Sequence, residues 1–254
     1  MFTPKTERIK QLSDRRPGVI EKITRLFSGG VNVYIDYANV RPWSEKLHWH
    51  IEPRRLKQFL QSFDNIRSVK FYQGELVGDL RSQKEIKHLQ SLECGRFTVR
   101  TKLVKIMRFS VDATSIDAQS PILLRKFIRA SLLRKMDIET IEFLNTKLAS
   151  MNKNGVYELE DRKCNFDVEI GTDMRVDHLK DGIGTFVLWS GDSDFADPVR
   201  YLLENGKRVI LFATAGRIAH ELNGLVSVGL GIFDIGEIQD FICWLPETGK
   251  KKTA

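Results

Sequence analysis

Two apolar segments of the sequence end abruptly in acidic residues. Residues 31–35 lead into Asp36, with Asn39 three positions further on, and residues 185–189 lead into Ser-Gly-Asp-Ser-Asp at positions 190–194. Carboxylates that converge repel one another, and such a cluster persists when a cation neutralises it. Oxygen ligands without His or Cys favour Mg²⁺ or Mn²⁺. The sequence therefore predicts a divalent-metal site built from strand-end aspartates.

The order of the other segments indicates how these acids are positioned. Apolar, β-branched runs alternate with amphipathic runs, which predicts an α/β fold with a mainly parallel central sheet flanked by helices. In such sheets ligands bind outside the carboxyl ends of the strands, so Asp36 and Asp192 are expected at the same edge. The expected strands cover residues 31–35, 69–72, 185–189, 208–213 and 231–235, and residues 97–106 are expected to be a strand or one arm of a hairpin. The expected helices cover residues 53–63, 83–92, 167–179, 196–204 and 219–222.

Three segments lie outside this alternation. Residues 1–30 are expected to form a helical lead-in and residues 246–254 a disordered basic tail, so that the main domain covers residues 31–245. Residues 121–151 have a helical pattern rich in Leu, Ile, Arg and Lys, and they are expected to be a helical insertion in that domain. The insertion could serve in packing, in contact between two copies of the chain or in nucleic-acid binding, and the sequence leaves these roles open.

The composition favours a soluble protein with a polyanionic partner. Among 254 residues no apolar run approaches the roughly 18 that a membrane span needs, and the three cysteines show neither disulfide nor zinc-ligand spacing, so a cytoplasmic location is expected. Residues 96–135 contain ten basic and two acidic residues, a net charge of +8, whereas residues 155–200 contain five basic and eleven acidic residues, a net charge of −6. A basic region beside an acidic site favours nucleic-acid contact, although basic surface also serves solubility alone.

A third group of acids lies between the two strand ends. Asp167 is expected to open the helix that precedes the second acidic strand, and Asp173 lies further along that helix. Asp177 and Asp181 are predicted to be solvated surface. Asp194 has an alternative role, because an aspartate near the start of a helix is often its N-cap.

Three blocks of the sequence resemble the NYN domains of the PIN-like nuclease superfamily, including their LabA-like branch. Residues 33–40 are similar to the opening strand with its Asp and Asn, residues 163–173 to the central acidic block, and residues 188–195 to the Ser-Gly-Asp-Ser-Asp-Phe signature. Order and spacing agree from about residue 31 to 241. Residues 164–166 depart from the usual Gly-Val before the central Asp, but no expected acid is missing.

The resemblance implies a PIN-like fold, a Rossmann-like three-layer sandwich, and hydrolysis of phosphodiester bonds, with RNA as the favoured substrate and DNA left open. It implies that three aspartates hold Mg²⁺ or Mn²⁺: Asp36, Asp167 and Asp192. The other catalytic residues that it implies are Asp173 and Asp194, which would complete the acidic ring, and Asn39, which would orient Asp36 or a ligand water.

Some side chains near these blocks are candidates for contact with nucleic acid. Arg41 follows the first acidic block and Arg217 lies in the loop after a later strand, so both are expected to bind phosphates. Trp43 is a candidate for stacking on an unpaired base, with packing in the core as its alternative. The resemblance and the apolar insertion also favour a homodimer.

A binding or regulatory protein that keeps this fold without turnover is the main alternative to a nuclease. The complete set of acids favours the enzyme. A phosphatase with an aspartate nucleophile needs Asp-x-Asp-x-Thr at a strand end, followed by a catalytic Lys. This interpretation is disfavoured, because Asp192-Ser193-Asp194 is followed by Phe195-Ala196. The sequence also lacks Gly-x-x-x-x-Gly-Lys-Ser/Thr, which excludes a P-loop.

Overall fold

The structure, a computed structural model, describes residues 1–112, 128, 134–153, 156–180 and 182–243. The chain divides into two compact units. The first consists of Met1–Leu103 and Cys164–Ala254, and the second of Val104–Lys163. Every candidate site residue predicted from the sequence belongs to the first unit.

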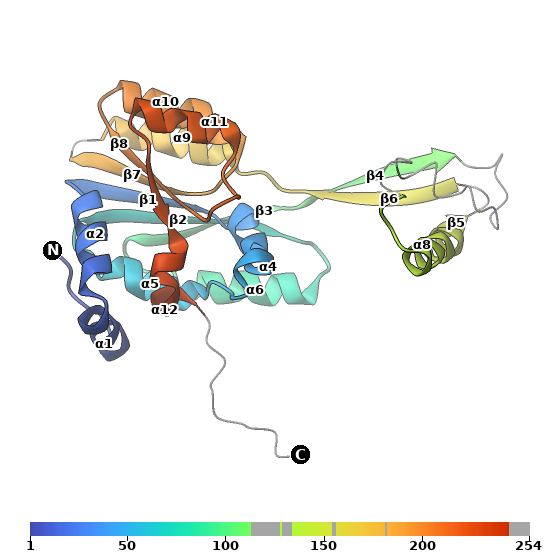
Figure 1. The fold of residues 1–254 in the computed structure, drawn as a ribbon, viewed down its shortest axis with the longest axis horizontal. Coiled ribbons are helices and arrows are strands. Elements are labelled where there is room, and N and C mark those ends of the chain that lie inside the picture. The colour runs from blue at the N-terminus through green and yellow to red at the C-terminus, as the bar shows by residue number, and fades with distance from the viewer. Residues whose placement is uncertain (113–127, 129–133, 154–155, 181, 244–254) are drawn as a thin grey trace, which may run out of the picture. The chain divides into compact units, whose positions relative to one another are not determined.

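The first unit is built around a six-stranded sheet whose neighbouring strands run parallel (Figure 1). The order across the sheet is β3-β2-β1-β7-β8-β9. This arrangement confirms the predicted α/β class. The strands are β1 (Gly30–Asp36), β2 (Ile66–Glu75), β3 (Phe97–Leu103), β7 (Ile183–Trp189), β8 (Arg208–Ala213) and β9 (Gly231–Asp234).

The two central strands are buried almost throughout, which explains their nearly continuous apolar sequences. Every residue of β1 is buried, and in β7 Gly184 is the single exposed position. Val33 of β1 lies opposite Val69 of β2 and Val187 of β7. Because side chains alternate between the faces of a sheet, this apolar row faces one layer and Tyr34 faces the other.

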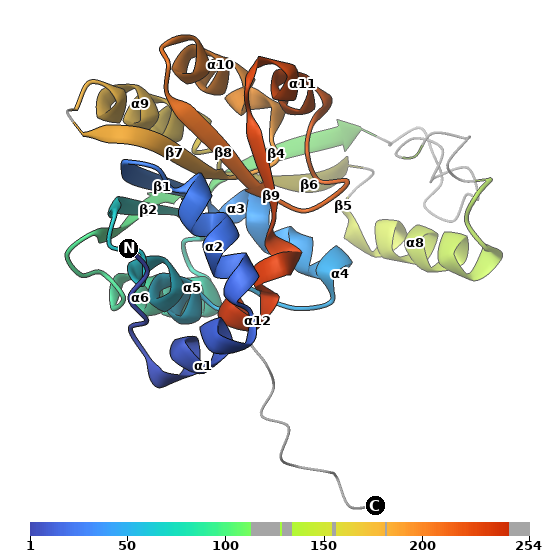
Figure 2. The same cartoon turned by 60° about the vertical axis from the view of Figure 1, so that its left-hand side comes forward.

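Helices cover both faces of the sheet and complete three layers, with α9 and α10 on one face and α2, α5 and α6 on the other (Figures 1 and 2). Helix α5 buries the apolar stripe that its sequence predicts, Leu56, Phe59 and Leu60, and α6 buries Ile86 and Leu89. The helices of this unit are α1 (Glu7–Arg15), α2 (Pro17–Leu26), α3 (Tyr37–Val40), α4 (Ser44–Leu47), α5 (Pro53–Gln61), α6 (Leu80–Gln90), α9 (Asp167–His178), α10 (Ala196–Glu204), α11 (His220–Gly224) and α12 (Gln239–Ile242), with the 3₁₀ turns η1 (Arg41–Trp43), η3 (Ser193–Phe195), η4 (Leu225–Val228) and η5 (Ile235–Ile238).

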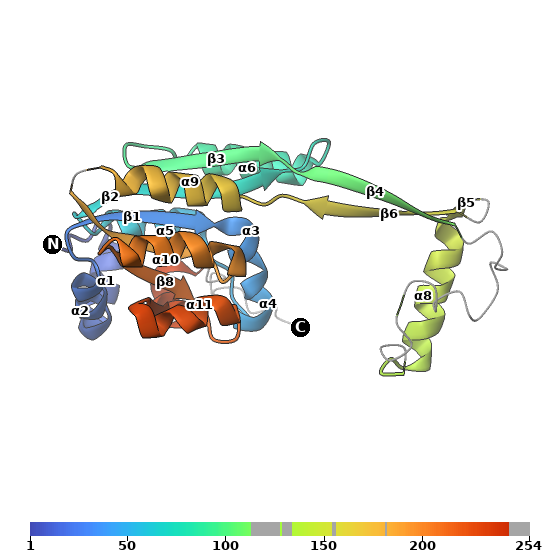
Figure 3. The ribbon, with the colours of Figure 1, turned by 90° about the horizontal axis from the view of Figure 1, so that it is seen from above.

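The second unit contains paired antiparallel strands and one described helix (Figure 3). Strand β4 (Lys105–Asp112) pairs with β6 (Val156–Lys163), and the short β5 (Asn152–Lys153) also pairs with β6. Helix α8 (Ile138–Met151) precedes β5. Its start is fixed by Asp137, whose carboxylate accepts a hydrogen bond from the Thr140 main-chain nitrogen at 2.7 Å.

This unit is wider than the expected insertion at residues 121–151 and is not purely helical. The expected strand at 97–106 is two strands, because β3 ends at Leu103 and β4 begins at Lys105, where the second unit starts. The alternating sequence continues across this border, so it carried no sign of the change. Residues 121–127 and 129–133 of the expected insertion, and the expected tail at 246–254, lie outside the described residues.

Among the described residues, the structure has no helix that is both long enough and apolar enough to cross a membrane.

Candidate functional site

The two acidic strand ends meet at the centre of the sheet. Strands β1 and β7 are parallel neighbours, and β2 and β8 flank them on opposite sides, so successive connections leave this point in opposite directions. Such a reversal in strand order opens a crevice outside the carboxyl ends of the two strands, where ligands bind in open α/β sheets. Asp36 is the last residue of β1, and Asp192 follows β7 by three residues. Their expected placement at one edge is therefore met.

Asp36 is buried, with 4% of its surface exposed. Its Oδ1 accepts a hydrogen bond from the main-chain nitrogen of Asn39 at 3.3 Å, and its Oδ2 accepts one from the hydroxyl of Ser190 at 3.3 Å. Burial raises the pKa of Asp36 to about 6, and the nearby charges of Asp167 and Asp192 act in the same direction against these two hydrogen bonds. The two hydrogen bonds hold the carboxyl group in place, while burial disfavours its ionised form.

The loop after β7 is tied to the loop after β1 through Asn39. The side-chain oxygen of Asn39 accepts a hydrogen bond from the Gly191 nitrogen at 3.1 Å. Position 191 admits only glycine here, because a Cβ would collide with the carbonyl group of Arg217. The Ser190 hydroxyl that contacts Asp36 also accepts from the Asp192 nitrogen at 3.3 Å. These contacts fix the relative position of the two acids.

Asp167 brings the third carboxylate to this edge from the first turn of α9. It is half-buried, and burial raises its pKa. The charges of Asp192 and Asp194 raise the pKa of Asp167 further. Asp36, Asp167 and Asp192 thus form one electrostatically coupled group, which we call the acidic edge.

The acidic edge fits a hard cation that keeps part of its water shell. Its donors are carboxylate oxygens, and burial, together with repulsion between the acids, raises the pKa values of Asp36 and Asp167, which a cation would lower again. Within the described residues, no group of three or more His, Cys, Asp or Glu side chains has the geometry to hold a metal ion directly. Mg²⁺ commonly takes only one or two carboxylates and retains several waters, so these residues suit it without direct contact from all three.

Burial of Asp36 predicts a pH dependence of stability. A raised pKa in the folded state favours folding while the group is protonated, so this contribution is complete below the unfolded pKa near 4 and is lost as the pH rises through about 6. In chelator, the unfolding free energy of wild type should fall across this range by roughly 3 kcal/mol relative to Asp36→Asn. Urea unfolding at a series of pH values measures the difference, and parallel profiles of the two proteins would contradict it.

The three other predicted catalytic residues have different places in the structure. Asp194 is exposed, and the capping alternative for it is wrong, because the following helix α10 has Phe195 as its N-cap and no hydrogen bond from a capping side chain. Asn39 orients Asp36 through its main chain and Gly191 through its side chain. Asp173 accepts a hydrogen bond from the Tyr72 hydroxyl at 2.6 Å and lies 3.3 Å from Lys70 Nζ. A place for Asp173 in the acidic ring stays a prediction.

Asp177 was predicted to be solvated surface, and this prediction is wrong. It is a buried group between α9 and the sheet, with 1% of its surface exposed. Its Oδ2 accepts from Tyr34 at 2.7 Å and Asn32 at 2.9 Å and lies 2.8 Å from Lys70 Nζ. Its spacing from Ile170 and Met174 places Asp177 on the inward stripe of the helix. This spacing is the signal in the sequence that could have predicted its burial. We call Asn32, Tyr34, Lys70 and Asp177 the buried polar cluster. Asp181 lies outside the described residues.

The predicted nucleic-acid contacts divide into exposed and buried residues. Arg41 is exposed and pairs with Glu85 at 3.0 Å. Arg217 is exposed, and its carbonyl group packs against Gly191 beside the acidic edge. Trp43 has 2% of its surface exposed, so the stacking prediction for it is wrong and packing in the core is its role. Phosphate binding by the two arginines stays a prediction.

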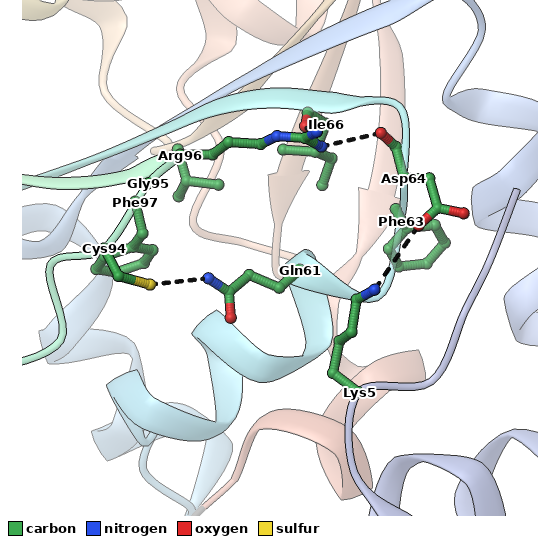
Figure 4. Close-up of a pocket in the computed structure, with 10 residues that line it drawn as sticks. Lys5, Gln61, Phe63, Asp64, Ile66, Cys94, Gly95, Arg96 and Phe97 are labelled. Carbon is green, nitrogen blue, oxygen red and sulfur yellow. Dashed lines mark hydrogen bonds and ion pairs between the residues drawn. The ribbon is translucent and has the colours of Figure 1, made fainter.

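A separate pocket of about 450 Å³ lies at the opposite end of the sheet (Figure 4). Ile66 and Phe97, which line it, are the first residues of β2 and β3, whereas the acids follow the carboxyl ends of their strands. Lys5 and Asp64 pair across it at 3.9 Å, and Arg96 donates to the Asp64 carbonyl at 3.0 Å. This pocket is therefore no extension of the acidic edge.

Comparison with known proteins adds one informative match. The chain matches the family model described as the NYN domain over residues 30–226. No curated protein matches it. A crystal structure of a protein of unknown function from Vibrio parahaemolyticus is similar, with 14% identity and a TM-score of 0.47, over 85% of this chain and 96% of that one. The family match includes all three residues of the acidic edge.

Proposed function

Because the chain belongs to the NYN domain family, which is part of the PIN-like nuclease superfamily, we propose that it is a Mg²⁺- or Mn²⁺-dependent nuclease that hydrolyses phosphodiester bonds in RNA. The observation that carries this proposal is the coupled carboxylate group at the point where the strand order reverses. A buried carboxylate whose pKa is raised to about 6 beside two others favours a site that works with a cation.

The residues of the acidic edge have separable roles in this reaction. Asp36, Asp167 and Asp192 would hold the ion, directly or through water. A bound divalent ion supplies a hydroxide near neutral pH and offsets the charge that the phosphodiester gains in the transition state. Asn39 and Ser190 keep Asp36 and the loop after β7 in place through the hydrogen bonds described above.

A side-chain nucleophile has no support at this edge. Ser190 is fully buried, and its hydroxyl donates to Asp36 while accepting from the Asp192 nitrogen. Both its position and its hydrogen bonds fit a structural role. Water is therefore the attacking group that we propose.

The test is cleavage of end-labelled single-stranded and hairpin RNA by the full chain, with Mg²⁺, with Mn²⁺ or with EDTA. We expect cleavage with either ion and none in EDTA. The same assay on DNA of matching sequence tests the preference for RNA. Absence of cleavage on every substrate would contradict the proposal and favour the binding or regulatory alternative.

A further inference from the structure

A second groove, of about 400 Å³, lies in the first unit between the end of β3 and the first half of α9. Two of its lining residues, Phe166 and Val168, flank Asp167 in the chain, so the groove begins beside the acidic edge. We call it the β3–α9 groove. Its lining residues are Arg100, Thr101, Lys102, Phe166, Val168, Glu169, Thr172 and Asp173.

Two cations of β3 border this groove on the same side of the strand. Arg100 and Lys102 are two residues apart, so their side chains leave the same face about 6.6 Å apart along the strand. This separation is comparable to that of successive phosphates in an extended single strand. The groove thus has a repeat of positive charge that suits a nucleic-acid backbone.

Arg100 keeps most of its hydrogen-bonding capacity toward solvent. Its side chain is 56% exposed, and its guanidinium lies 3.7 Å from Asp173. That carboxylate already accepts from Tyr72 at 2.6 Å and lies 3.3 Å from Lys70 Nζ. The charge of Asp173 is therefore shared with partners other than Arg100, and the guanidinium can form a second, charge-assisted bond.

Lys102 is held in the groove by a pair that a phosphate can replace. Its Nζ lies 2.7 Å from Glu169 and 4.6 Å from the centre of the Phe166 ring. The Lys102 and Glu169 side chains are 35% and 46% exposed, and ion pairs this exposed contribute little to stability. A phosphate would compete with the Glu169 carboxylate for the same ammonium group.

We propose that the β3–α9 groove binds the backbone of single-stranded nucleic acid next to the acidic edge, with Arg100 and Lys102 contacting successive phosphates. The proposal rests on the proposed function for the nature of the ligand. An edge of carboxylates repels a polyanion, so cations close to it are needed to hold the strand. Val168 is 79% exposed at the same place and offers an apolar surface to an unpaired base.

The first test measures binding of a short fluorescein-labelled single-stranded RNA of mixed sequence by fluorescence anisotropy. All proteins carry Asp192→Asn, which is expected to slow cleavage during the measurement. Arg100→Gln with Lys102→Gln should weaken binding about tenfold and reduce the slope of log affinity against log salt by roughly 1.4, the value for two contacts to a single strand. The matched control is Arg16→Gln with Lys22→Gln, which removes two cations that are likewise paired with acids.

The second test uses a substitution that should act in the opposite direction. Glu169→Gln releases Lys102 from its pair and should tighten binding about two- to fivefold, the equivalent of one exposed ion pair. Glu237→Gln is the control, because Glu237 pairs with Lys22 at 2.6 Å and has similar exposure. Thermal melting of each variant confirms that it is folded.

Equal weakening by the groove and control pairs, or no tighter binding by Glu169→Gln than by Glu237→Gln, overturns the groove proposal. Failure of the proposed function gives a different result, namely no metal-dependent cleavage by wild type while binding still responds to the groove variants. Absence of measurable binding by every variant overturns the groove proposal as well. The same titrations with DNA show whether the groove responds to the backbone alone or also to the 2′-hydroxyl.

Discussion

Replacing Asp192 with asparagine should lower the rate of metal-dependent RNA cleavage by at least about 100-fold. Residues that only orient a metal ligand commonly contribute 10- to 100-fold, so a proposed ligand should contribute more. Asparagine is the informative substitution because Asp192 also caps η3 through the Asp194 nitrogen, and asparagine is an equally good cap. The variant thus removes the charge while it keeps the fold of the loop.

Single-turnover cleavage with Mg²⁺, measured beside circular dichroism and thermal melting, separates loss of activity from loss of structure. Asp197→Asn is the matched control, since it makes the same chemical change five residues away on a side chain that is 85% exposed. We expect the control to cleave at the wild-type rate. Full activity of Asp192→Asn would refute the role of the acidic edge in catalysis.

Strand-end chemistry was the part of the site that the sequence could predict. Strands β1 and β7 are buried almost throughout, so their apolar runs stop where the chain reaches the edge of the sheet, and the acids that follow them stand out in the sequence. Asp36 and Asp192 were found in this way. Asp167 was recognised as a further acid at the start of a helix, but its role as a ligand came from the resemblance, because an acid at that position is ordinary by itself.

The positions of acids on helices were harder to predict. An acid on a helix is assigned to the surface unless its place relative to the apolar stripe of the helix is considered. Asp173 and Asp177 share α9 with Asp167, yet one contacts Tyr72 and the other the buried polar cluster. The buried partners of Asp177 come from β1 and β2, more than a hundred residues earlier in the chain, so the reason for its burial is tertiary. Trp43 was misassigned for the same reason, since only the fold shows that its loop packs inward.

The buried polar cluster joins α9 to β1 and β2. We therefore expect a single substitution there to lower stability the most. Burial alone raises the pKa of Asp177, but hydrogen bonds from Lys180, Lys70 and Tyr34 outweigh it and hold the pKa below its ordinary value. A lowered pKa stabilises the fold above the unfolded pKa near 4, and this contribution is lost as the pH falls through the folded value. The cluster therefore favours folding at neutral pH.

Asp177→Ala should lower the unfolding free energy at neutral pH by about 3–5 kcal/mol, because it leaves the ammonium of Lys70 buried without its closest partner. Chemical denaturation measures this change, and Asp197→Ala, an exposed acid on the neighbouring helix α10, should change stability by less than about 0.5 kcal/mol. Lys70→Met combined with Asp177→Leu should recover most of the loss, since apolar groups of similar volume often replace a buried pair without cost. An Asp177→Ala protein as stable as the control would show that Lys70 finds water or Asp173 instead, and that the cluster does not hold α9 on the sheet.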